Sequence, residues 1–276
     1  MHVELVVPAL FQAGADAPAL ELLLARARRT DSERRTLEDW HGQAFGIPGP
    51  LPAGALTALA FGKAAGEWLR ADPVHLRADR DRLLLIPSAG FELMADEARQ
   101  LCDELNRHFA DQFTLEPFAP EVWGLLPKIA LPLQSRPPLE IAGRDIDAEL
   151  PQKHWHALLN EIQMALYQHP VNTAREVRGT PVVNSLWPWG AGPLPVAAQG
   201  PWLSLSADDP ALLGLAKLAG IRHRTPGPGA AVWLERAPDA GRHLMVLDAL
   251  RGAAAMGDGE ALAQRLQTME VEWFAP

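Results

Sequence analysis

The chain has 276 residues, of which 48% are hydrophobic, so it is long and apolar enough to build a substantial core. Its 34 acidic and 25 basic side chains give a net charge of −9, which argues against nucleic acid as the partner. The single cysteine, Cys102, excludes a disulfide framework and a thiolate metal site. No apolar run is long enough to cross a bilayer, and the start MHVELVVPAL is typical of a strand rather than a signal peptide, so we expect a cytoplasmic protein without a membrane partner.

The first half of the chain predicts short elements separated by turns. Residues 71–85 predict two strands joined by a turn, in which Asp72 and His75 are candidate polar contacts near a strand end. A hairpin with solvated charges is the alternative there. Residues 117–138 are rich in proline and predict an irregular segment. The other patterns in this half predict a buried strand over 2–10 and helices over 19–28, 33–45 and 94–109.

The stretch 158–195 holds the densest mixture of polar, aromatic and turn residues in the chain. Its apolar residues recur at helical spacing as far as Leu166, and Pro170 is expected to end this helix because its ring blocks continuation. A short connection then leads to a buried strand over 182–187. That strand runs into a rigid turn with the sequence WPWGAG.

We predict a ligand site in this stretch. Amide, guanidinium and indole groups converge where a strand meets a glycine turn, and glycines let backbone N–H groups approach an anion. A purely structural role is equally open, because Trp fills cores and Asn caps backbone groups at turns. The candidate ligand-binding residues are Asn172, Arg175, Asn184, Trp187, Trp189, Gly190 and Gly192, together with Asp72 and His75.

The last part of the chain alternates strands and helices. Strands are predicted over 202–206, 230–234 and 243–247, and helices over 210–219 and after the N-cap residue Asp258. This alternation predicts an α/β fold with a mostly parallel sheet flanked by helices. We expect a single domain over 1–276, with 71–138 as a candidate inserted lobe.

The residues alone show no complete catalytic constellation. His154 and His156 are two positions apart, so they do not share a helix face as zinc ligands at i and i+4 would. The chain has no Gly-x-Ser-x-Gly elbow and no Gly-rich Walker loop. The sequence therefore predicts no nucleophile and no phosphate-binding loop.

Several stretches resemble the archaeal-type cofactor-independent phosphoglycerate mutases of the alkaline phosphatase superfamily. Residues 184–195, NSLWPWGAGPLP, are similar to that family's Asn-x-x-Trp-x-Trp-Gly-x-Gly turn, and HPVN followed by Arg175 matches the segment before it. ADPVHL, LLNEIQM, HPVN and NSLWPWGAG also resemble a proteobacterial group of RpfE-type regulatory proteins. The resemblance implies an alkaline phosphatase-like core with a smaller inserted lobe.

The chain departs from the mutases at their metal ligands. The mutases bind two metals through Asp and His side chains and use a nucleophilic serine. Their first strand ends in an Asp-Gly ligand where this chain has Val7-Pro8-Ala9-Leu10, and Gly252 stands where a late histidine ligand is expected. Only Asp248 and Asp258 remain as weak metal candidates. The resemblance therefore implies a relative without catalytic residues and without a cofactor.

Two functions remain open at this stage, and the first is favoured. One is a non-catalytic regulatory or ligand-binding protein that takes a small phosphorylated or carboxylate metabolite, or a protein partner. The other is a phosphoglycerate mutase or phosphoesterase with a rearranged site that binds two divalent metals such as Mn or Zn. Its candidate ligands are Asp72, His75, Asp208, Asp248 and Asp258.

Overall fold

A computed structural model describes residues 1–275 except 32, 34, 81, 90, 147, 148, 150–152, 238 and 239. The chain divides into two compact units. We call Met1–Gly49 with Ala197–Pro276 the terminal unit and Pro50–Val196 the central unit. The candidate lobe 71–138 lies inside the central unit, whose bounds are wider, and the number of domains stays a prediction.

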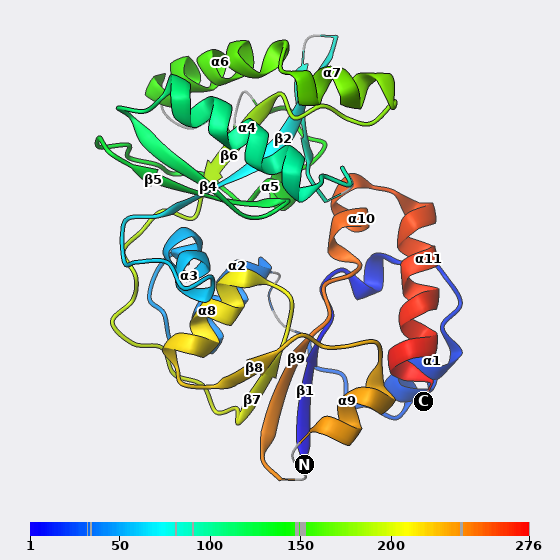
Figure 1. The fold of residues 1–276 in the computed structure, drawn as a ribbon. Helices are drawn as coiled ribbons and strands as arrows, with labels where there is room; N and C mark the ends of the chain where they lie inside the picture. The colour runs from blue at the N-terminus through cyan, green and yellow to red at the C-terminus, as the bar shows by residue number, and fades with distance from the viewer. Residues whose placement is uncertain are drawn as a thin grey trace. The chain divides into compact units, whose positions relative to one another are not determined.

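The terminal unit is built on a four-stranded parallel sheet in the order β1-β9-β7-β8 (Figure 1). Its strands are β1 (His2–Val6), β7 (Ser204–Ser206), β8 (Arg222–Arg224) and β9 (Arg242–Val246). Its helices are η1 (Leu10–Gln12), α1 (Pro18–Ala25), α2 (Leu37–Ala44), α8 (Pro210–Leu218), α9 (Ala230–Arg236), α10 (Arg251–Met256), α11 (Gly259–Met269) and the π-helical η3 (Glu270–Phe274). The predicted α/β class with a parallel sheet flanked by helices is confirmed.

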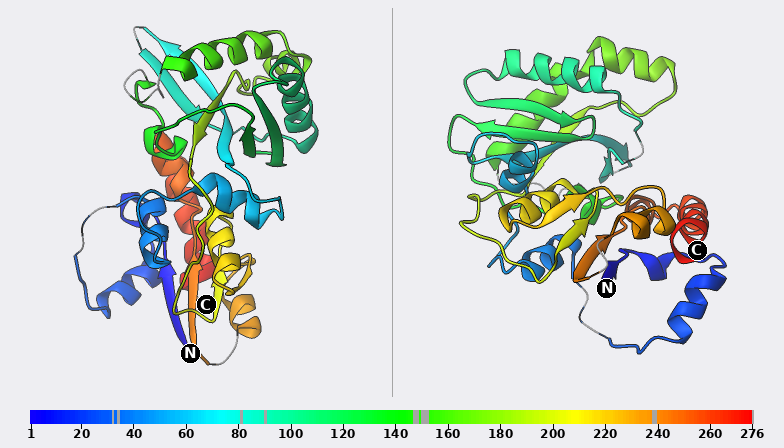
Figure 2. Two further views of the ribbon diagram at one scale, coloured as in Figure 1. Left: turned by 90° about the vertical axis from the view of Figure 1, so that its left-hand side faces the viewer. Right: turned by 60° about the horizontal axis from the view of Figure 1, so that its bottom comes forward.

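Helices cover both faces of this sheet (Figure 2). On one face, Met245 of β9 packs in a core cluster with Trp233 of α9 and Leu262 of α11. The helices α2 and α8 lie on the other face, and Leu212 and Leu215 of α8 are fully buried. Because the strands are parallel, their carboxyl ends all lie at the same edge of the sheet.

The central unit is built on an antiparallel sheet in the order β3-β2-β5-β4, with β6 also paired to β2. Its strands are β2 (Leu69–Asp79), β3 (Arg82–Pro87), β4 (Phe113–Ala119), β5 (Val122–Pro127) and β6 (Ser185–Trp189). Its helices are α3 (Ala53–Ala60), α4 (Ala95–His108), α5 (Pro138–Ile141), α6 (Lys153–Tyr167) and α7 (Pro170–Val177). The apolar stripes of α4 and α6 pack in one core cluster with this sheet, as their helical periodicity predicts.

Four local predictions are wrong in instructive ways. The first strand ends at Val6 and lies at a sheet edge, so Leu5 is 45% exposed rather than buried. The proline-rich segment 117–138 opens with the β4–β5 hairpin, and 230–234 form the helix α9, because a short apolar run does not separate strand from helix. The helix α6 ends before Pro170 as predicted, but the predicted connection after it is the helix α7, which Pro170 begins, since proline suits the first helical position, where no N–H partner is required.

Candidate functional site

The guanidinium of Arg175 was the predicted anion ligand, and it is bound within the central unit. Arg175 lies on α7, not on a connection, and is 1% exposed. Its Nε donates to the Pro181 carbonyl at 2.7 Å, and its two terminal nitrogens donate to Glu97 Oε2 at 2.7 Å and to the Phe91 carbonyl at 2.5 Å. The side chain therefore clamps α4 and two connections to α7.

The two asparagines of the predicted site bind backbone groups. Asn172 donates to the carbonyls of Leu166 and Val183 and accepts from the Val183 N–H, all at 2.8–3.0 Å. Asn184 accepts from the Leu76 N–H at 2.7 Å and donates to the Leu76 carbonyl at 2.9 Å, so its amide replaces a peptide group beside β2. The side-chain nitrogen and oxygen of each amide therefore both have a partner in the fold.

Asp72 and Trp189 form a buried polar network at the pairing of β2 with β6. Asp72 Oδ2 accepts from Trp189 Nε1 at 2.7 Å, and Oδ1 accepts from Arg70 Nε at 2.9 Å and from its terminal nitrogen at 2.8 Å. Burial raises the pKa of Asp72, although Arg70 and Trp189 favour the carboxylate. His75 contacts the Val182 carbonyl through Nδ1 at 3.0 Å, and burial lowers its pKa. The network joins two strands and leaves neither oxygen of Asp72 without a donor.

The glycine turn after Trp189 serves close packing. Gly190 has φ +67°, and an added Cβ would lie 2.8 Å from the Ala53 Cβ. Its carbonyl accepts from the Gly54 N–H at 2.9 Å. Trp187, two positions before Trp189 in β6, donates to the Arg136 carbonyl at 2.8 Å. Only glycine permits this approach of the turn to α3, while Gly192 has φ +140° beside Pro52.

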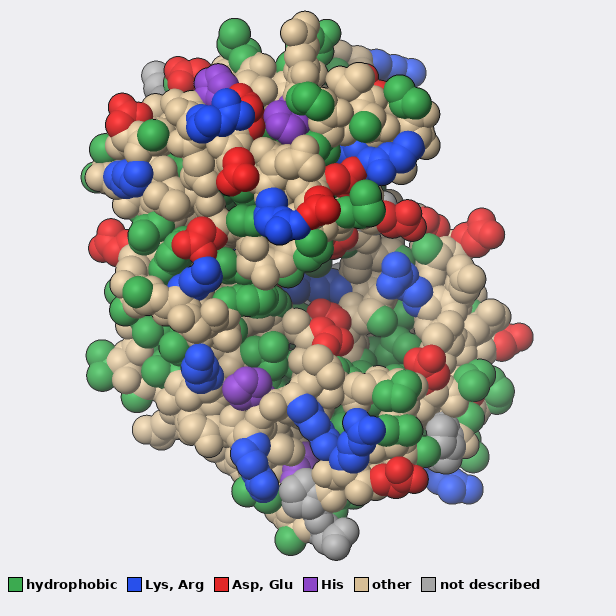
Figure 3. All heavy atoms as spheres, in the orientation of Figure 1, with side chains coloured by type: hydrophobic (Ala, Val, Ile, Leu, Met, Phe, Trp, Pro, Cys, Tyr) green, Lys and Arg blue, Asp and Glu red, His purple; other side chains and the backbone are tan. Residues whose placement is uncertain are grey.

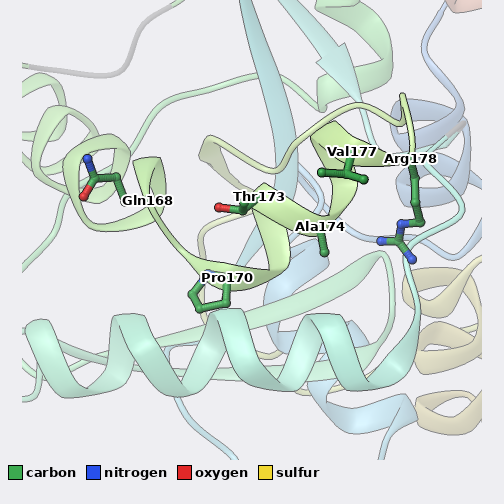
Figure 4. Close-up of a pocket in the computed structure, with 6 residues that line it drawn as sticks. All are labelled: Gln168, Pro170, Thr173, Ala174, Val177 and Arg178. Atoms are coloured by element: carbon green, nitrogen blue, oxygen red, sulfur yellow. The ribbon is translucent and has the colours of Figure 1, made fainter.

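The structure brings Asp72 and Trp189 of the predicted site together, and the polar side chains of the other members bind groups within the fold. This favours the structural alternative, and ligand binding by them stays a prediction. A shallow pocket of about 580 Å³ lies along the other face of α7 (Figure 4). Its lining excludes Asn172 and Arg175 and consists of Gln168, Pro170, Thr173, Ala174, Val177 and Arg178.

A different polar group lies at the carboxyl ends of the parallel strands in the terminal unit. Asp208 and Asp209 follow β7, and Asp248 follows β9 by two positions. Ligands of open α/β sheets bind at this edge, because successive strands end there and diverging connections leave room. We call the following set the edge cluster: Glu38, His41, Asp208, Asp209, Asp248 and Arg251.

Helix α2 supplies two members of the edge cluster. Thr36 caps α2 by accepting from the Asp39 N–H at 3.0 Å, which fixes the first turn carrying Glu38. Glu38 and His41 are three positions apart and therefore share one helix face. Arg251, at the start of α10, donates to Glu38 Oε1 at 2.5 Å. This pair joins α2 to the segment that follows β9.

Three buried side-chain atoms of the described residues have no hydrogen-bond partner, and all belong to the edge cluster. They are Glu38 Oε2 and both ring nitrogens of His41. His41 is 1% exposed, so its ring is shielded from bulk solvent. Buried polar groups are almost always hydrogen-bonded, and leaving one unpaired costs about 1–3 kcal/mol. The edge cluster therefore carries unused hydrogen-bonding capacity that the predicted central site lacks.

Two side chains of the edge cluster have shifted pKa values. Burial, together with the charges of Asp209 and Asp208, raises the pKa of Asp248 to about 6, and Arg251 only partly opposes this. Burial also lowers the pKa of His41, against the charges of Asp209 and Glu38. At neutral pH the imidazole is thus neutral beside an excess of carboxylates.

The weak metal candidates do not assemble into a cage. Asp258 caps α11 by accepting from the Ala261 N–H at 2.9 Å, which is a structural task. Asp209 likewise caps α8 through the Leu212 N–H at 2.7 Å. Among the residues that the structure describes, no three His, Cys, Asp or Glu side chains are placed to hold a metal ion. The backbone after β1 passes through Ala9 at φ 64°, with no acid from Val7 to Leu10.

Sequence reasoning identified Asp208 and Asp248 as candidates but missed the other members of the edge cluster, Glu38, His41, Asp209 and Arg251. The signal was the i, i+3 pair of Glu38 and His41 on a short polar helix, which becomes informative only once both side chains are known to be buried. Over the face drawn in Figure 3, positive and negative side chains are interspersed, and a single-signed patch is not evident there. No helix of the described chain has the length and apolarity to span a membrane.

Comparison with known proteins leaves the family open. No family model and no curated protein matches this chain. Among solved structures, the PH0037 protein from Pyrococcus horikoshii is similar with a TM-score of 0.49 and 15% identity, over 97% of this chain and 76% of that one. A cofactor-independent phosphoglycerate mutase from Thermoplasma acidophilum DSM 1728 is similar with a TM-score of 0.40 and 16% identity, over 96% of this chain and 82% of that one. Likenesses at this level support no argument about function.

Proposed function

We propose that this chain is a non-catalytic binding protein whose ligand binds at the edge cluster. The observation that carries the proposal is the set of buried, unpartnered atoms on Glu38 and His41, at the sheet edge where α/β folds bind ligands. A binding role also agrees with the sequence, which lacks the acid after the first strand that the phosphoglycerate mutases use. A regulatory role, as in the RpfE-type group that the sequence resembles, and a cytoplasmic location belong to the same proposal.

The proposal moves the binding site away from Arg175. An anionic metabolite at Arg175 would have to displace the Glu97 carboxylate and two carbonyl groups from a side chain that is 1% exposed. Such an exchange removes the buried Arg175 guanidinium from Glu97 and leaves the carboxylate with the half-exposed Arg178 and the Met94 N–H, which is unfavourable in a buried setting. At the edge cluster, Glu38 Oε2 and the ring nitrogens of His41 have no partner, so a ligand that binds these atoms displaces no existing hydrogen bond.

A thermal-shift screen of small metabolites tests the binding role. We expect a ligand that raises the melting temperature of the wild-type chain, with the shift reduced in His41→Gln and Glu38→Gln. Arg178→Ala, in the central unit, is the matched control and should keep the shift. A ligand whose shift disappears in Arg175→Lys but persists in both edge variants would return the site to the predicted central residues.

The competing function is a metal-dependent phosphoglycerate mutase or phosphoesterase with a rearranged site. It is favoured by one observation, the convergence of Asp208, Asp209 and Asp248 in one electrostatic group. Elemental analysis of the purified chain for manganese and zinc, with mutase and phosphatase assays, separates the two functions. Stoichiometric metal with turnover that is lost in Asp248→Asn would establish the enzyme and end the binding proposal.

A further inference from the structure

We propose that the edge cluster binds a small organic cation with several N–H donors, such as an alkylamine or a guanidinium compound. This inference rests on the proposed function, because it names the ligand class for the same site. It differs from the anionic metabolite that the sequence predicts. Three properties of the cluster support it, namely its unused acceptors, its charge and the spacing of its carboxyl groups.

The unused atoms call for hydrogen-bond donors. Glu38 Oε2 is an acceptor, and a neutral imidazole offers one acceptor nitrogen and one N–H. Arg251 already donates to Glu38 Oε1 at 2.5 Å, so Oε2 is the Glu38 oxygen that lacks a hydrogen-bond partner. A ligand that donates to both Oε2 and the imidazole acceptor gives two buried acceptors the hydrogen bonds that they lack.

The charge of the cluster calls for a positive ligand. The carboxyl groups of Glu38, Asp209 and Asp248 act on the guanidinium of Arg251, and that of Asp208 acts on Asp248. The influence of these carboxyl groups on one another is visible at Asp248, where the charges of Asp209 and Asp208 add to burial in raising its pKa. A cation relieves this repulsion, whereas an anion increases it.

The spacing of the carboxyl groups favours a polyatomic cation over a bare ion. In the part of the chain that the structure describes, no three His, Cys, Asp or Glu side chains are close enough together to ligate one metal ion. Metal ligands must lie within about 2–2.6 Å of the ion. An amine or guanidinium reaches separated acceptors through N–H groups that point in different directions, at hydrogen-bond distances of about 2.7–3.2 Å.

Binding of such a cation is coupled to protons at Asp248. The groups that act on Asp248 are Asp208, Asp209 and Arg251, and Glu38 and His41 complete the cluster. A cation stabilises the ionised form of Asp248, so binding releases a proton at pH values below about 6. Affinity is therefore expected to rise about tenfold between pH 5 and pH 7.5. An anionic ligand would show the opposite pH dependence.

Calorimetric titration of the full chain with probes of one length tests the ligand class. We compare 1,4-diaminobutane, 1,4-butanediol and succinate, which carry four carbons and differ in charge, and add methylguanidine as a planar cation. We expect binding of a cationic probe, tighter at pH 7.5 than at pH 5, and weaker by about tenfold or more in Asp248→Asn and Glu38→Gln. Glu260→Gln, an exposed acid in the first turn of α11, is the control and should bind like wild type.

The outcomes distinguish this inference from the proposed function. Binding of succinate alone, weakened in His41→Gln, overturns the cation class but leaves a binding site at the edge cluster. Absence of binding by both cationic probes at millimolar concentration also overturns the class, while the metabolite screen still decides the binding role. Equal weakening in Glu260→Gln and Asp248→Asn would mean non-specific attraction to an acidic protein, and it would overturn the inference as well.

Discussion

The central polar network and the edge cluster use similar side chains in opposite ways. Around Arg175, Asn172 and Asp72, each buried donor and acceptor described above has a partner in the fold. At the edge cluster, three buried atoms on Glu38 and His41 have none. A stretch dense in polar residues therefore shows that many groups require hydrogen bonds. Groups that find partners within the fold have a structural role, and buried groups that find none are candidates for ligand binding.

The largest expected effect is at the centre of the scaffold. Arg175→Ala removes the buried guanidinium that donates to Glu97 Oε2 and to the carbonyls of Phe91 and Pro181, so we expect a loss of about 3–5 kcal/mol in unfolding free energy. Urea denaturation followed by circular dichroism measures it. Arg178 also pairs with Glu97 but is partly exposed, so Arg178→Ala should cost only about 0–1 kcal/mol. Equal losses in the two variants would contradict the structural role of Arg175.

A second test concerns the glycine turn of the scaffold. Gly190→Ala combines left-handed backbone strain with a Cβ only 2.8 Å from the Ala53 Cβ, and we expect a loss of about 2–4 kcal/mol. Gly179 has φ +70° with nothing within 4 Å of an added Cβ, so Gly179→Ala reports the strain alone, about 1 kcal/mol. Thermal melts of both variants give the difference. A Gly190→Ala chain as stable as Gly179→Ala would show that the turn has room for a side chain, as a ligand-facing turn would.

At the edge cluster we expect a substitution to raise the free energy of unfolding instead of lowering it. The pKa of Asp248 is raised from 3.8 to about 6, so the folded state holds this proton more tightly than the unfolded state. Its contribution favours folding below pH 4 and is lost as the pH rises towards 6, which makes the carboxylate destabilising at pH 7. Asp248→Asn should therefore raise stability by about 1–2 kcal/mol at pH 7, after allowance for partial exposure, and by little at pH 4. Urea denaturation at the two pH values measures this, and a destabilised variant at pH 7 would give Asp248 a structural role.

The smallest expected effect lies at the turn after β1. Ala9 occupies a left-handed conformation at φ 64°, which a residue with a Cβ adopts at a cost. Ala9→Gly should stabilise the chain by about 0.5–1 kcal/mol, while Ala15→Gly, in the same connection without this conformation, should not. Differential scanning calorimetry resolves a difference of this size. Destabilisation by Ala9→Gly would mean that the Ala9 methyl group packs more favourably than its backbone is strained.

Periodicity predicted most of the fold because one-sided burial leaves a direct trace in sequence. The stripes of α4 and α6, the β2–β3 hairpin and the α/β class followed from it. The role of Arg175 did not, because its partner Glu97 is 78 positions away and no local pattern records such a pairing. His41 was missed for a related reason. A lone histidine on a helix becomes notable only when tertiary packing has buried it without a hydrogen-bond partner in the fold.

The pairing of β1 with β9 sets an order for assembly of the chain. Residues 2–6 form their ladder with 242–246, so the first strand leaves the ribosome long before its neighbour exists. The central unit is continuous over residues 50–196 and has no such wait. During synthesis, the apolar side chains of Val3 and Leu5 therefore stay on an unpaired strand, the kind of segment that chaperones shield. A chain halted before residue 242 would release its central sheet complete, while β1 would lack the strand that joins it to β7 and β8.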